Sequence, residues 1–112
     1  MSMELTSRDY HRVSVVRVEG RVDAAHAPKL DETLDGYLKA GRSHVVLELD
    51  GVNYISSAGL RTLVSTQKAL KERGGYLALA QPSEKVTEAL KLAGFEVLFQ
   101  LFDKTEAAVG SV

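Results

Sequence analysis

The sequence predicts an α/β fold, with a mixed but mainly parallel sheet of four to five strands and about four helices. Short runs rich in valine and leucine alternate along most of the chain with amphipathic runs of helical period, which favours parallel strands joined by helices. The first two strand-like runs follow each other directly, which predicts a strand of opposite direction at one edge. Because 45% of the 112 residues are hydrophobic, the chain can build one core. We therefore expect a single domain over residues 1–112.

The N-terminal part of the chain contains two predicted strands and one helix. Residues 4–9 are predicted to form an edge strand, and the valine-rich residues 12–19 a second strand that ends at Gly20. Pro28 suits the first turn of a helix, and Gly41 suits its end. Between these two residues, apolar side chains recur at helical spacing at Leu30, Leu34, Tyr37 and Leu38.

The middle of the chain repeats this alternation. Residues 44–49 are a short apolar run typical of a central strand covered on both faces, and Asp50-Gly51 has the composition of a turn. A helix is predicted next, ending at Gly74-Gly75. Its apolar stripe consists of Leu60, Leu63, Val64, Gln67 and Leu70.

The last part of the chain predicts two more strands and two more helices. Residues 76–80 form a strand, and Ser83 caps a helix that Gly94 ends. Residues 97–102 are a short apolar segment that we expect to form a final strand. Asp103 and Glu106 have the spacing of a capping box for a last helix.

Charge and composition exclude several classes of function. The net charge of -1 predicts no nucleic-acid binding. The chain has no cysteine, and His11, His26 and His44 lie in separate segments, so we expect no metal and no cofactor. The chain has neither a signal-peptide pattern nor an apolar stretch near the ~20 residues of a membrane span, so we expect a cytoplasmic protein without membrane contact.

The most informative segment is residues 50–60, which place two hydroxyls in a turn of small residues before a predicted helix. At Ser56 and Ser57 the free backbone N–H groups and the positive end of the helix favour a phosphate. A phosphorylation switch is one hypothesis. Capping of the helix by one of these serines is the other, and the two are compatible.

A second polar loop is predicted at the same edge of the sheet. Asp23 follows the second strand, as the two serines follow the third. Because ligands of such sheets bind at the carboxyl ends of the strands, we expect Asp23 and Ser57 to lie near each other.

Together these segments resemble the STAS domain of bacterial anti-sigma factor antagonists. The resemblance centres on Ile55-Ser56-Ser57-Ala58-Gly59-Leu60 and covers nearly the whole chain. It includes Gly20-Arg21-Val22-Asp23, Pro82 with Val86, and the C-terminal segments Gly94-Phe95, Leu98-Phe99 and Leu101-Phe102-Asp103.

The resemblance implies a partner-switching protein of transcription regulation that is not an enzyme. The serine that matches Ser57 is phosphorylated by an anti-sigma factor that is also a serine kinase of the histidine-kinase-like ATPase type. The unphosphorylated form binds this partner and so frees a sigma factor, and a PP2C-type phosphatase resets the switch. The implied contact surface consists of Asp23, Ala24, His26, Ser56, Ser57, Ala58, Gly59, Leu60 and Arg61.

Two departures from the family pattern flank the acceptor. Ser56 stands where aspartate is common, which leaves Ser56 as the alternative acceptor, and Ala58 stands where serine or threonine is common. A second hypothesis is a STAS subunit that is never phosphorylated and serves a lipid-transport or stress-signalling assembly. A third is an enzyme or small-ligand site at the same edge, for which the sequence shows no pair of nucleophile and base.

Overall fold

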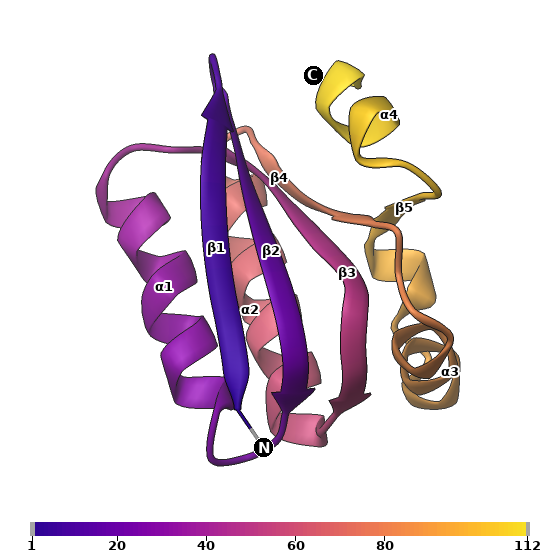
Figure 1. Ribbon diagram of the computed structural model, residues 1–112. Helices are drawn as coiled ribbons and strands as arrows, with labels where there is room; N and C mark the ends of the chain where they lie inside the picture. The colour runs from indigo at the N-terminus through magenta and orange to yellow at the C-terminus, as the bar shows by residue number, and fades with distance from the viewer. Residues whose placement is uncertain (1, 112) are drawn as a thin grey trace.

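The structure, a computed structural model, describes residues 2–111 and contains one five-stranded sheet in the order β1-β2-β3-β4-β5 (Figure 1). The edge strand β1 (Met3–Tyr10) runs antiparallel to β2 (Val13–Val22). The strands β3 (His44–Ile55), β4 (Tyr76–Ala80) and β5 (Gln100–Phe102) continue the sheet in parallel. The prediction of a mixed sheet with one antiparallel edge is confirmed.

Three helices cover one face of the sheet and a fourth lies against the other. The helices α1 (Ala27–Lys39), α2 (Ser57–Glu72) and α3 (Glu84–Ala93) each connect two neighbouring parallel strands. Since β2 to β5 are added in one direction and such crossovers are right-handed, all three helices lie on the same face. The short α4 (Thr105–Gly110) follows β5 and packs on the opposite face (Figure 1).

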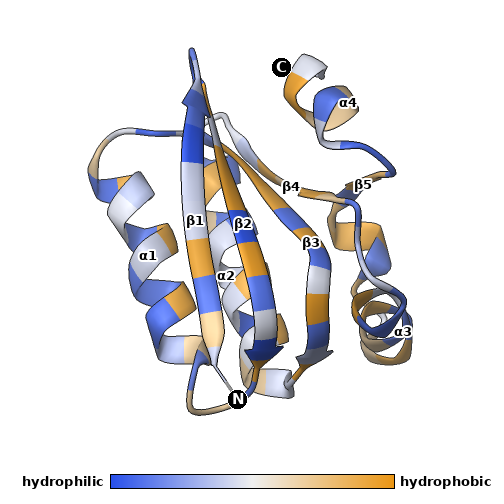
Figure 2. Ribbon diagram, in the orientation of Figure 1, coloured by the Kyte–Doolittle hydropathy of each residue, from blue (hydrophilic) through white to orange (hydrophobic). Residues whose placement is uncertain are grey.

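The central strand β3 is buried on both faces, as predicted. Val45, Leu47 and Leu49 pack in the larger core with α1, α2 and α3. Val46 points to the other side, into a smaller cluster beneath α4. All of Val45–Leu49 are buried, and hydrophobic segments concentrate in the middle of the sheet (Figure 2).

Both central strands are longer than predicted. Gly20 lies inside β2, and Asp50-Gly51 lies inside β3, so the predicted strand end and the predicted turn are wrong. Arg17 pairs with Glu48 but Glu19 pairs with Gly51, which leaves an extra residue on β3. Such a bulge bends a strand without ending it, and it uses the same residue types as a turn. The two strands therefore continue to the rim of the sheet.

The C-terminal elements differ in detail from the prediction. Ser83 caps α3 and Gly94 ends it in the left-handed conformation, as expected. A 3-10 turn, η1 (Glu96–Leu98), occupies the first part of the predicted last strand. The predicted capping box of Asp103 and Glu106 is wrong, because the N-cap residue of α4 is Lys104, whose side chain makes no capping hydrogen bond within residues 2–111. Instead the Thr105 backbone N–H donates to Gln81 Oε1 at 3.2 Å, a tertiary contact.

Candidate functional site

The rim where β2 and β3 end is also where α1 and α2 begin (Figure 1). Val22 and Ile55 are paired in register, and the Ser56 N–H donates to the Val22 carbonyl oxygen at 2.8 Å. The loop that follows β2 and the first turn of α2 are thereby held side by side. The expected proximity of the two loops is thus present in the structure.

The two adjacent serines have different surroundings. Ser56 is the N-cap of α2, and its Oγ accepts a hydrogen bond from the Gly59 N–H at 3.2 Å. Ser57 is the first helical residue and is exposed, and its hydroxyl makes no hydrogen bond to any residue between 2 and 111. The cap and the free hydroxyl therefore belong to different residues, which leaves Ser57 open to modification without loss of the cap.

Asp23 is held by its own loop. Its Oδ1 accepts hydrogen bonds from the His26 backbone N–H at 2.9 Å and is 2.8 Å from His26 Nδ1. The backbone hydrogen bond from His26 is the main reason why the pKa of the Asp23 carboxyl lies below its ordinary value. Asp23 is therefore a fixed negative charge at neutral pH, on the loop beside the start of α2.

Some of the predicted contact residues line an open groove between the N-terminal halves of α1 and α2. Ala24 contributes from the loop, and Ala58 and Arg61 contribute from α2. Gly59 and Leu60, which follow Ala58, are buried. A Cβ on Gly59 would lie 2.8 Å from Val22 Cγ1 and 2.9 Å from Ile55 Cγ1, so glycine allows α2 to begin against both strand ends.

Sequence reasoning did not identify the rest of the groove. Its remaining lining residues are Ala27, Pro28, Asp31, Thr62 and Ser65. Thr62 and Ser65 follow Ala58 at helical spacing, so the helical period of α2 could have predicted them. The Arg21 guanidinium lies 4.1 Å from the centre of the Tyr54 ring. That contact depends on the shifted pairing register of β2 and β3 at the bulge. No local pattern in the sequence predicts this register.

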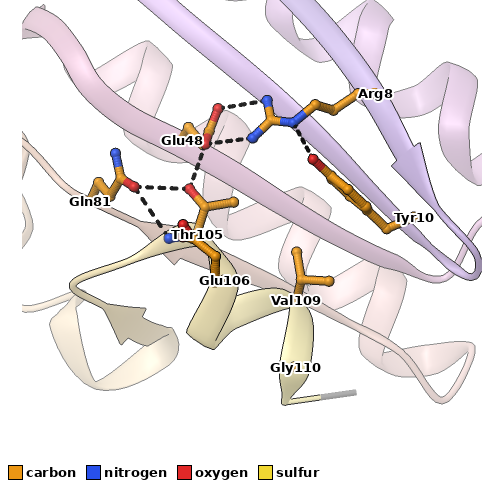
Figure 3. A pocket seen from close by; sticks show the side chains of 8 residues that line it. All are labelled: Arg8, Tyr10, Glu48, Gln81, Thr105, Glu106, Val109 and Gly110. Atoms are coloured by element: carbon orange, nitrogen blue, oxygen red, sulfur yellow. Dashed lines mark hydrogen bonds and ion pairs between the residues drawn. The ribbon is translucent and has the colours of Figure 1, made fainter.

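A second cavity, of about 360 Å³, lies on the other face of the sheet between α4 and β1 (Figure 3). Beside it, Glu48 accepts two hydrogen bonds from Arg8, at 3.0 and 2.9 Å, and a third from the Thr105 hydroxyl. The Arg8 hydrogen bonds are the first cause that lowers the pKa of the Glu48 carboxyl. The network links the edge strand, the central strand and α4.

The Glu48 network predicts a pH dependence of stability. Because the folded-state pKa of Glu48 is lowered, its contribution is complete above the unfolded value of about 4.3 and is lost as the pH falls through the folded value. We expect Glu48→Gln to destabilise the protein by about 1–3 kcal/mol at pH 7, since it removes charged hydrogen bonds. Urea unfolding should show this difference shrinking below pH 4. A constant difference from pH 7 to pH 3 would contradict the assignment.

Within residues 2–111, no buried side-chain nitrogen or oxygen lacks a hydrogen-bond partner. In the same range, no group of three histidine, aspartate or glutamate side chains is placed to hold a metal ion. None of the helices described is long and apolar enough to cross a membrane.

Comparison with known proteins finds the same fold and family. The profile of the STAS domain matches residues 4–108. BtrV of Bordetella bronchiseptica, assigned as an anti-sigma factor antagonist, is 32% identical over 109 residues, which are 97% of this chain and 94% of that protein.

Solved structures agree with this match. The crystal structure of an anti-sigma factor antagonist from Mycobacterium paratuberculosis superimposes with a TM-score of 0.89 at 25% identity, over 99% of this chain and 94% of that one. The Bacillus cell fate determinant SpoIIAA, solved in its phosphorylated form, superimposes with a TM-score of 0.75 over 98% of each chain. At 14% identity this last similarity shows the fold alone.

Proposed function

This chain belongs to the STAS domain family, and from that premise we propose that it is an anti-sigma factor antagonist switched by phosphorylation of Ser57. The observation that carries the proposal is the exposed Ser57, whose hydroxyl is free while the neighbouring Ser56 caps the helix. In the unphosphorylated form the protein binds an anti-sigma factor at this rim and so releases a sigma factor.

The proposed partner is an anti-sigma factor that is also a serine kinase of the histidine-kinase-like ATPase type. A PP2C-type phosphatase removes the phosphate and restores binding, and the cycle takes place in the cytoplasm. The naming of BtrV as an anti-sigma factor antagonist supports the first partner, and the resemblance around Ser57 suggests the two enzymes.

The proposed mechanism is electrostatic. Phosphorylation adds about -1.5 to -2 charges at neutral pH. At the first residue of α2 the helix dipole tolerates this charge, so the fold persists. A partner surface that packs against a neutral hydroxyl has no group to pair with the added charge, and burying a charge without such a partner group costs several kcal/mol. The ionised Asp23 on the adjacent loop adds repulsion of the same sign toward an acidic partner group.

Mass spectrometry of the purified protein tests the proposal directly. After incubation with ATP and a candidate anti-sigma factor of the histidine-kinase-like ATPase type, we expect one phosphate on Ser57. Ser57→Ala should abolish the modification. Ser56→Ala should keep it and cost only the N-cap, about 1 kcal/mol. Phosphate on Ser56 would overturn the assignment of the acceptor, and no phosphate at all would favour the subunit that is never phosphorylated.

A further inference from the structure

Arg61 is an exposed cation without a partner at the proposed switch. It lies in the second turn of α2 and lines the groove beside Ala58. Among the residues from 2 to 111, no carboxylate lies within ion-pair distance of its guanidinium, although Asp31 lines the same groove. A cation that the fold does not use is available to a ligand or to a modification.

The helix places Arg61 over Ser57. The two residues are four positions apart on α2, so their side chains are neighbours on the same face of the helix. Helical side chains lean toward the N-terminus of the helix, which directs the long arginine side chain back toward Ser57. An anion four residues before a cation is also the favourable order for such a pair.

The first turn of α2 contains no competing carboxylate. On the adjoining loop, the Asp23 carboxylate already contacts His26 Nδ1 at 2.8 Å and the Arg21 guanidinium at 3.7 Å. A phosphate on Ser57 would therefore be the first anion within reach of Arg61 along this helix face. The guanidinium plane matches two phosphate oxygens in a bidentate pair, which a lysine could not reproduce.

We propose that Arg61 is the intramolecular counter-ion of the phosphate on Ser57. Phosphorylation then has two effects on the rim: it adds a negative charge, and it withdraws a guanidinium that the unphosphorylated form offers to an acidic group of its partner. The inference rests on the proposed function, because it assigns a role within the phosphorylated form.

The pair can be tested without any kinase. Phosphoserine is incorporated genetically at position 57, and the second pKa of the phosphate, ordinarily near 6, is followed by phosphorus NMR at an ionic strength of about 0.15 M, where charges three helical turns apart are screened. We expect this pKa to be about half a unit lower in the parent chain than in Arg61→Gln. The matched control is Lys68→Gln, which also removes one positive charge. Lys68 is exposed and lies three turns of α2 away from position 57, so this variant should leave the pKa of the phosphate unchanged. Equal values in the parent chain and in Arg61→Gln would overturn the proposal.

Binding provides a second readout. Arg61→Gln should weaken binding of the unphosphorylated protein to the anti-sigma factor by about tenfold, and it should reduce the effect of phosphorylation on affinity by a similar factor. If the effects of Arg61→Gln and of phosphorylation on the binding free energy simply add, phosphorylation does not withdraw Arg61 from the partner, and the proposal is overturned in this respect. A lowered phosphate pKa in a protein that no kinase modifies would refute the proposed function and leave the ion pair standing.

Discussion

Replacing Ser57 by aspartate is expected to weaken binding of the anti-sigma factor by about 30- to 100-fold. Ser57 is exposed at the first turn of α2, where a partner packed against the hydroxyl would bury the new charge. Aspartate carries one negative charge where phosphate carries nearly two. We therefore expect a loss of about 2–3 kcal/mol in binding free energy, which is part of the full penalty for an uncompensated buried ion. Titration calorimetry with the purified anti-sigma factor measures the loss.

Stability separates this effect from misfolding. An acidic residue at the start of a helix is favourable by about 0.3–1 kcal/mol, so Ser57→Asp should unfold at the same or a slightly higher temperature than the parent chain. Ser57→Ala should bind within about threefold of the parent chain. Gln100→Glu adds the same charge at the exposed β5 edge and should not affect binding. Tight binding by Ser57→Asp would refute the electrostatic mechanism.

Replacing Gly75 by alanine is expected to destabilise the protein by about 3 kcal/mol or more. A Cβ at this position would lie 1.7 Å from the Ser43 carbonyl oxygen and 2.5 Å from its carbon, so backbone would have to move. The same carbonyl accepts the Tyr76 N–H at 2.9 Å where β4 joins the sheet. Overpacking typically destabilises a protein by about 1–3 kcal/mol, and a clash with rigid backbone atoms is expected to cost the upper end of this range or more. Thermal unfolding should show a midpoint lower by roughly 10 °C.

Gly36 provides the control for this experiment. It lies in the interior of α1, and a Cβ there would meet nothing within 4 Å. Gly36→Ala should therefore raise stability by about 0.5–1 kcal/mol, because alanine loses less backbone entropy in a helix. Opposite signs for the two variants are the expected result. If Gly75→Ala and Gly36→Ala changed the stability equally, the close approach of Gly75 to the Ser43 backbone would not matter for stability.

The rim could be predicted in part because its signals are local. Ser56 and Ser57 stand between an apolar strand run and an amphipathic helix, and the rule for strand ends associates Asp23 with them. Their separate roles could not be predicted, since either serine fits the cap by composition. The structure assigns the cap to Ser56, because the Ser56 N–H donates to the Val22 carbonyl oxygen and α2 begins at the next residue, Ser57.

The order of the elements and the parallel sheet with one antiparallel edge follow from the sequence alone, because hydrophobic period and turn residues act over a few neighbouring positions. The tertiary structure sets the ends of β2 and β3, since Asp50-Gly51 suits a turn and a bulge equally, and pairing of Gly51 with Glu19 selects the bulge. It also decided the start of α4, which depends on Gln81, a residue distant in sequence. Contacts between distant segments are set by packing of the whole domain, and no local pattern encodes them.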